Sequence, residues 1–187
     1  MTIEPITDRP QRADARRNRE RILAAAREAF AAHGADAQMD DVARRAGVGV
    51  GTVYRHFPTK EALMGELIAQ RFGTFVENAR EALAIADPWE AFAGLLLRNA
   101  ELMARDVAVQ QALMGWHASW ELAEPNRCAL DEIGAVLIAR GIKAGVLRSD
   151  LSVQDIGMLM CGVSSTMSIE RFDWRRHLEI VLDGLRA

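Results

Sequence analysis

The stretch from Gly47 to Leu63, GVGVGTVYRHFPTKEAL, constrains the fold of this chain more than any other. Three alternating glycines open it, and they permit backbone angles and close approaches that a side chain would obstruct. Val53 and Phe57 lie four residues apart, so they share one helical face and are predicted to be buried. Pro58 ends this helix, because the residue before a proline is pushed out of the α region. The stretch therefore predicts a turn, a two-turn helix and a second helix capped by Thr59.

The remaining surface of the two-turn helix is polar. Thr52, Tyr54, Arg55 and His56 fall outside the buried face, and Lys60 follows in the first turn of the next helix. These side chains are hydrogen-bond donors and acceptors of different reach. A short helix with such an outer face, and with a basic residue just beyond it, is expected to press against a partner.

The composition favours helices over sheet. Half of the 187 residues are hydrophobic, prolines number five, and tyrosine occurs once. Ala, Leu, Glu and Arg are abundant and form helices well, whereas strands prefer β-branched and aromatic residues. Apolar residues recur at helical spacing along most of the chain, which predicts an all-α protein with about nine helices and no strand.

The charge is distributed unevenly along the chain. The net charge of −3 excludes a general polycationic coat for nucleic acid. Residues 1–60, however, carry eleven Lys and Arg against eight Asp and Glu, whereas residues 61–187 carry twelve against eighteen. The charge of the first part is therefore suited to binding a polyanion, whereas the charge of the second part is not.

Several classes of protein and site are not indicated by the sequence. Cys128 and Cys161 are far apart and match neither a metal cluster nor a disulfide scaffold. The first residues lack the apolar segment of a signal peptide. The longest uncharged runs, 107–120 and 156–169, are shorter than the ~20 residues of a membrane span. We therefore expect a cytoplasmic protein without metal, cofactor or membrane partner.

The first third of the chain predicts three helices after a mobile basic arm at residues 1–12. A first helix is expected over 14–33, followed by Gly34 as its stop. A second, short helix is expected over 39–46, and a turn at Gly47 joins it to the two-turn helix. Two short helices joined by a glycine turn and packed on a longer helix form a helix-turn-helix.

Between Arg17 and Leu67 the sequence resembles the DNA-binding domain of TetR-family transcriptional regulators. The matching residues are Ile22-Leu23-x-Ala25-Ala26-x-x-x-Phe30-x-x-x-Gly34, Met39-Asp40-Asp41-Val42-Ala43, Ala46-Gly47-Val48 and Gly51-x-Val53-Tyr54-x-His56-Phe57-x-x-Lys60-Glu61-x-Leu63. This resemblance covers roughly the first third of the chain. It implies a helix-turn-helix DNA-binding domain over 13–58, with its second short helix in the major groove.

The resemblance also implies roles for individual residues. Val50, Gly51 and Thr52 would meet base edges, Gly51 because its bare backbone can come close. Gln38 and Gly49 stand where the family usually has hydroxyl residues that cap a helix or contact phosphate. Further contacts to the DNA backbone are implied for Arg44, Tyr54, Arg55 (which can also reach a guanine), His56 (alternatively a packing residue) and Lys60.

Residues 59–187 predict a second helical domain that binds an effector and dimerises. A single helix over 59–86 is long enough, at 1.5 Å per residue, to connect two domains as a strut. The resemblance implies that the second domain binds a small molecule. Pockets for such ligands are mostly apolar with a few polar anchors. The residues predicted to line this one, each of which is alternatively ordinary core, are Phe75, Phe92, Leu96, Met103, Met114, His117, Trp120, Val136 and Cys161. Gln110 and His117 would need a partner or a ligand if buried.

Residues 152–186 predict two helices with small and apolar faces. The resemblance implies that they form a four-helix bundle with the same helices of a second copy, although they could instead close the monomer's own core. A homodimer would place two recognition helices on a palindromic operator, one or two turns of double-stranded DNA apart.

We therefore predict a ligand-responsive transcriptional repressor, released from its operator by a small, largely apolar effector. One alternative is a regulator or adaptor whose helical domain binds a protein. A helical enzyme is a second alternative, but the sequence has no phosphate loop and no His-Glu-x-x-His motif, and its four histidines are isolated. We accordingly assign no catalytic residue.

Overall fold

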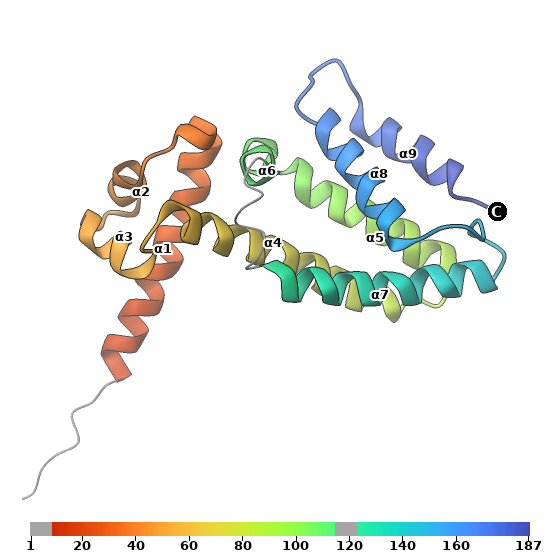
Figure 1. Cartoon of the computed structure of the whole chain (residues 1–187), viewed down its shortest axis with the longest axis horizontal. Helices are drawn as coiled ribbons and strands as arrows, with labels where there is room; N and C mark the ends of the chain where they lie inside the picture. The colour runs from red at the N-terminus through yellow and green to blue at the C-terminus, as the bar shows by residue number, and fades with distance from the viewer. Residues whose placement is uncertain (1–8, 115–122) are drawn as a thin grey trace, which may run out of the picture.

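The computed structural model describes residues 9–114 and 123–187, which form an elongated, two-part assembly of helices (Figure 1). The prediction of an all-α fold is confirmed. Nine α-helices are present in the described ranges: α1 Arg9–His33, α2 Met39–Ala46, α3 Val50–His56, α4 Lys60–Leu83, α5 Pro88–Ala104, α6 Val107–Met114, α7 Glu124–Lys143, α8 Val153–Thr166 and α9 Trp174–Gly184. The described residues contain no strand beyond one isolated bridge between Leu147 and Arg186.

Helices α1, α2 and α3 make the first part of the molecule, on the left in Figure 1. The first helix begins at Arg9, so the last four residues of the predicted arm are helical in the structure. Ile22, Phe30, Val42 and Val53 are buried together in its core, which follows their helical spacing. The buried faces of the three helices therefore meet in one core, and their polar faces point outward.

The long helix α4 leaves this part and runs beneath the second (Figure 1). The Thr59 side chain caps its start, accepting a hydrogen bond from the Ala62 amide at 3.1 Å. The helix ends at Leu83, three residues before the predicted end at Ala86. Arg140 of α7 donates to carbonyl oxygens beyond that end, including that of Ile85, and so fixes α4 to α7.

Helices α5, α7, α8 and α9 complete the second part around their own core. Side-chain caps at Asp87, Ser152 and Asp173 start α5, α8 and α9. Ser152 and Asp155 form a reciprocal capping box. A hydrophobic cluster joins α5, α7, α8 and α9, and includes the buried residues Phe92, Leu96, Ile138, Val163 and Leu178.

Helix α6 lies at the junction of the two parts (Figure 1). Val109 is 1% exposed and belongs to the same buried cluster as α1, α2, α3 and α4. Ala123, just before α7, is buried in that cluster too. The core of the first part therefore extends into a segment that the sequence assigns to the second.

Candidate functional site

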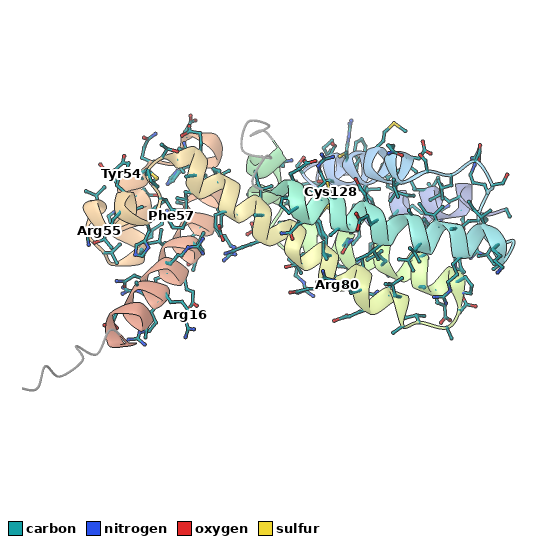
Figure 2. The ribbon with its side chains drawn as sticks, turned by 60° about the horizontal axis from the view of Figure 1, so that its bottom comes forward. Arg16, Tyr54, Arg55, Phe57, Arg80 and Cys128 are labelled. Atoms are coloured by element: carbon teal, nitrogen blue, oxygen red, sulfur yellow. The ribbon has the colours of Figure 1, made fainter. Side chains whose placement is uncertain are left out.

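Helix α3 presents one apolar face to the core and one open face to solvent. Val53 is fully buried, whereas Val50 is 41% exposed and Tyr54 is 47% exposed. Gly51 and Arg55 are exposed beside them. Tyr54 and Arg55 lie at the outer end of the first part, away from the second (Figure 2). The open face of α3 is therefore accessible to a large partner.

The turn before α3 is held by α1 as well as by its own backbone. Gly47 adopts a left-handed conformation with φ of 62°, which explains the need for glycine there. Arg21 Nη2 donates to the Ala46 carbonyl oxygen at 2.6 Å, at the end of α2. The Val48 amide donates to the Ala43 carbonyl oxygen at 3.1 Å. These contacts fix α3 relative to α1 and α2, so its open face has a defined direction.

The other residues predicted to contact DNA, on α3 and around it, differ in their exposure. Gln38 and Arg44 are exposed, while Thr52, His56 and Lys60 are partly buried. The Gln38 amide donates to the Asp36 carbonyl oxygen at 2.8 Å, and the Gln38 side chain makes no cap contact with α2. The absence of that cap agrees with the poor capping ability of Gln.

Lys60 and His56 each lie near an aromatic ring of the core. The Lys60 ammonium is 5.7 Å from the centre of the Phe30 ring. The His56 and Phe57 ring centres are 6.5 Å apart. A cation or imidazole at such a ring keeps a polar end toward solvent while its apolar body packs. Contact with phosphate and packing are therefore compatible at both positions.

Two arginines near the start of the chain have structural partners that sequence reasoning missed. Arg19 forms an ion pair with Glu66 of α4 at 2.8 Å and lies over the Phe57 ring at 5.3 Å. Arg21 holds the turn before α3. Arg16 remains highly exposed, with its Nε atom 3.8 Å from Glu20. Arg16, Arg19 and Arg21 differ in the residues that they contact. The contacts of Arg19 and Arg21 lie far away in the sequence, so the local sequence does not predict them.

Asp41 forms ion pairs with both arginines of α2. Its carboxylate accepts a hydrogen bond from Arg45 Nε at 3.0 Å and another from Arg44. The hydrogen bond from Arg45 is the main cause that lowers the pKa of Asp41, and the charge of Arg44 adds to it. Arg44 is nevertheless 76% exposed at its side chain and stays on the outer surface of α2.

The second part contains a cavity of about 470 Å³ between α4, α5, α6, α7 and α8. It is open on one side, because the lining residues Met158 and Cys161 are exposed. A volume of this size is within the ~300–1,000 Å³ of pockets for small ligands. Most of the lining is apolar, and α4, α5, α6, α7 and α8 together contribute seven polar or charged residues to it: Arg71, Asn99, Gln110, Arg127, Asp131, Gln154 and Ser164. The lining includes Ile68, Arg71, Phe72, Phe75, Phe92, Leu96, Asn99, Met103, Gln110, Leu137, Ile138, Gln154, Met160, Cys161 and Ser164.

Five of the nine residues predicted for the pocket line this cavity: Phe75, Phe92, Leu96, Met103 and Cys161. The prediction for Val136 is corrected, because its side chain is 55% exposed on the outer face of α7. Gly134 and Leu137 line the cavity in its place. Of the remaining predictions, His117 and Trp120 lie outside the described residues, as does the side chain of Met114.

The sequence-based prediction did not include Arg71 and Asn99 among the cavity residues. Asn99 is 7% exposed and accepts a hydrogen bond from the Asn78 amide at 2.8 Å. Arg71 Nη1 donates to the Leu102 carbonyl oxygen at 2.9 Å. Both positions lie on the buried stripes of their helices, where an apolar residue is the ordinary expectation. A polar residue at such a position is the signal that could have found them.

Metal-binding clusters and membrane-spanning helices are both absent from the described ranges. No group of three or more His, Cys, Asp or Glu residues within 9–114 and 123–187 could hold a metal ion. None of the helices in these ranges is long and apolar enough to cross a bilayer.

The sequence matches two profiles of known protein families. The profile for bacterial regulatory proteins of the tetR family matches residues 22–67. The profile for the C-terminal domain of SbtR-like transcriptional regulators matches residues 87–187. Together the two matches include the helix-turn-helix and most of the second part.

Individual relatives agree with these matches. A crystal structure of a TetR transcription regulatory protein from Mycobacterium vanbaalenii is 36% identical, with a TM-score of 0.66, and the match covers 95% of this chain and all of that one. The uncharacterized HTH-type transcriptional regulator TtgW of Pseudomonas putida is 40% identical over 80 residues, 42% of this chain and 60% of TtgW, less than two thirds of its length. The fatty acid metabolism regulator protein of Bacillus subtilis is 28% identical over 140 residues, 71% of this chain and 72% of that protein.

Proposed function

This chain belongs to the TetR family of bacterial transcriptional regulators, and we propose that it is a dimeric repressor released from its operator by a small, largely apolar effector. The observation that carries this proposal is one chain with both an open face on α3 and a largely apolar cavity in its second part. We place the functional boundary after Pro58, where DNA reading ends and effector sensing begins. Helix α6 packs across that boundary.

The exposed surface of α3 supports direct reading of DNA. Val50 and Gly51 are exposed at its first turn, and an added Cβ at Gly51 would have no neighbour within 4 Å. A base edge can therefore approach the bare backbone of Gly51 closely. Tyr54 and Arg55 are exposed and can contact phosphates, and Lys60 follows at the start of α4. Phosphate contacts position the protein without reading sequence.

The cavity supports a small-molecule effector rather than a protein partner. It lies inside the second part and is lined mainly by apolar side chains, whereas a protein partner would need an extended outer surface. The name of the Bacillus subtilis relative, a fatty acid metabolism regulator, agrees with an apolar effector. An effector changes DNA binding only through its different affinity for the two forms of the dimer.

The outer face of α8 and α9 supports dimerisation. Met158 and Ile180 are 66% and 55% exposed, respectively, and Met158 also lines the cavity. Val163 and Leu178, on the same two helices, are buried in the monomer's own core. The two helices therefore close their own core and still leave apolar side chains for a second copy.

Operator binding by contact variants tests the proposal. The DNA would be a duplex that the protein itself selects from a random pool. We expect Tyr54→Phe and Lys60→Ala to weaken binding, and Lys60→Ala to reduce the slope of log affinity against log salt by about 1. Unchanged affinity in both variants would reject these contacts, and failure to select any duplex would reject the function.

A further inference from the structure

Gln110 of α6 and Arg71 of α4 line one end of the apolar cavity, whose wall also carries Arg127 and Asp131 of α7. Gln110 is 6% exposed, and its Oε1 atom has no hydrogen-bond partner among the described residues. A buried amide without a partner is costly. Oε1 is an acceptor, so either a donor in the cavity binds it, or the amide rotates and turns its two N–H donors toward an acceptor there.

Arg71 supplies a positive charge at the same end. Its only hydrogen bond to a described residue runs from Nη1 to the Leu102 carbonyl oxygen, at 2.9 Å, and no described carboxylate forms an ion pair with it. Burial lowers the pKa of Arg71, the charge of Asp106 opposes that effect, and the charge of Arg27 adds to it. The guanidinium stays protonated, so a cation faces the cavity without a directly bound anion from the described residues.

Asp106 lies close to both Arg71 and Gln110. Asp106 precedes α6, and its carbonyl oxygen accepts a hydrogen bond from the Gln110 amide N–H at 2.9 Å. Asp106 also lines a second, polar hollow of about 650 Å³ that has Arg71 in its wall. Arg71 therefore separates the polar hollow from the apolar cavity, next to the first turn of α6.

We propose that the effector is an amphipathic carboxylate, with its apolar chain in the cavity and its carboxylate held by Arg71 and Gln110. This inference deepens the proposed function and depends on it. A guanidinium binds a planar carboxylate through two parallel hydrogen bonds. The Gln110 amide carries two donors on nitrogen besides its carbonyl oxygen, and rotation of the amide presents them to the same head group. A cationic head would be repelled by Arg71.

The same two residues connect the head group to the DNA-binding part. The hydrogen bond from Arg71 to Leu102 links α4, which carries the first part, to the last turn of α5. A carboxylate competes with Leu102 for this guanidinium. Gln110 is preceded in α6 by Val109, which is buried in the core of the first part. A carboxylate at this end therefore contacts both helices that reach the DNA-binding part.

Binding of three probes of equal chain length tests the inference. Dodecanoate, dodecanol and methyl dodecanoate would be titrated calorimetrically, below micellar concentrations, into the full-length protein. We expect dodecanoate to bind at least about tenfold more tightly than either neutral probe, because hydrogen bonds to charged groups are the strong ones. This preference should disappear in Arg71→Gln and persist in Arg80→Gln, which removes an exposed charge from α4 outside the cavity.

A second variant keeps the test decisive if Arg71→Gln fails to fold. Gln110→Glu is nearly isosteric and places a negative charge beside the head group, so it should weaken dodecanoate binding by about tenfold or more and spare dodecanol. Equal binding of all three probes to the wild type, or no binding of any, overturns the carboxylate assignment. So does an unchanged dodecanoate preference in both variants.

The effect on DNA separates this inference from the proposed function. Displacement of the selected duplex would be measured with each probe. If dodecanol and dodecanoate displace DNA equally effectively, the proposal that an effector releases the protein from its operator stands, and the carboxylate assignment fails. If dodecanoate binds with the expected preference and leaves the duplex bound, the assignment stands and effector release by this ligand fails.

Discussion

Val109 and Gln110 are consecutive residues of α6 that face different parts of the molecule. The Val109 side chain is 1% exposed and packs in the core built by α1 to α4, whereas Gln110 lines the cavity of the second part. Adjacent side chains on a helix point about 100° apart, so a helix at the junction can touch both. A rotation or shift of α6 therefore changes the core of the DNA-binding part and the cavity wall together.

Shortening Val109 should weaken this link. Val109→Ala removes two buried methyl groups and should lower the free energy of unfolding by about 2 kcal/mol. Urea unfolding followed by circular dichroism measures the loss. The matched control is Val136→Ala on the exposed face of α7, which should change stability by less than about 0.5 kcal/mol. Equal effects in the two variants would contradict the packing of Val109.

The turn before α3 depends on a side chain that lies far away in the sequence. Arg21→Met keeps the apolar stem and removes the hydrogen bond to the Ala46 carbonyl oxygen. A partly buried hydrogen bond from a charged donor contributes about 1.5–3 kcal/mol, so we expect a stability loss near the lower end of that range. Operator affinity should fall as well, because α3 loses its fixed direction. Arg80→Met is the control on an exposed helix face, and a loss of the same size there would refute the role of Arg21.

Local patterns in the sequence predict most of the fold, because helix periodicity and capping are local. The caps at Thr59, Asp87 and Ser152 are read directly from residue types and spacing. The burial of Val53 and Phe57 follows from their separation of four residues. The open face of α3 is then fixed, so the residues expected to face DNA could be chosen before the structure was known.

The cavity is less predictable, because it depends on the rotation of each helix about its axis. Val136 and Leu137 are adjacent apolar residues, and only the packing of α7 on α4 and α5 decides which faces inward. The helical pattern places Arg71 on a buried stripe, but its hydrogen-bond acceptor, the Leu102 carbonyl oxygen, is thirty-one residues away. No local pattern specifies a contact of that separation.

Acid should reveal the contribution of Asp41 to stability. Its folded-state pKa lies below the ordinary value of 3.8, mainly because Arg45 donates a hydrogen bond to it. A lowered pKa stabilises the fold at pH values above 3.8, and this stabilisation is lost as the pH falls through the folded-state pKa. The stability difference between the wild type and Asp41→Asn should therefore be largest near neutral pH and shrink in acid. A difference that stays constant from neutral pH down to acid unfolding would contradict this assignment.

Two glycines four residues apart should respond to alanine in opposite ways. Gly47→Ala places a Cβ atom in a left-handed conformation and 2.9 Å from Arg21 Nη2. It should reduce the free energy of unfolding by about 1–2 kcal/mol. Gly51 lies inside α3, where an added Cβ has no neighbour within 4 Å. Gly51→Ala should leave stability unchanged or raise it by about 0.5–1 kcal/mol, because alanine favours a helix over glycine.

The same pair separates folding from DNA reading. If the bare backbone of Gly51 approaches a base edge, Gly51→Ala should lose operator affinity while its thermal midpoint is retained or increased. Gly47→Ala should lose both together, because its turn sets the direction of α3. Thermal unfolding and titration of the selected duplex, carried out on the same samples, give the two quantities. Full operator affinity in Gly51→Ala would show that DNA does not approach α3 at this residue, and would move base reading to the side chains of Val50 and Thr52.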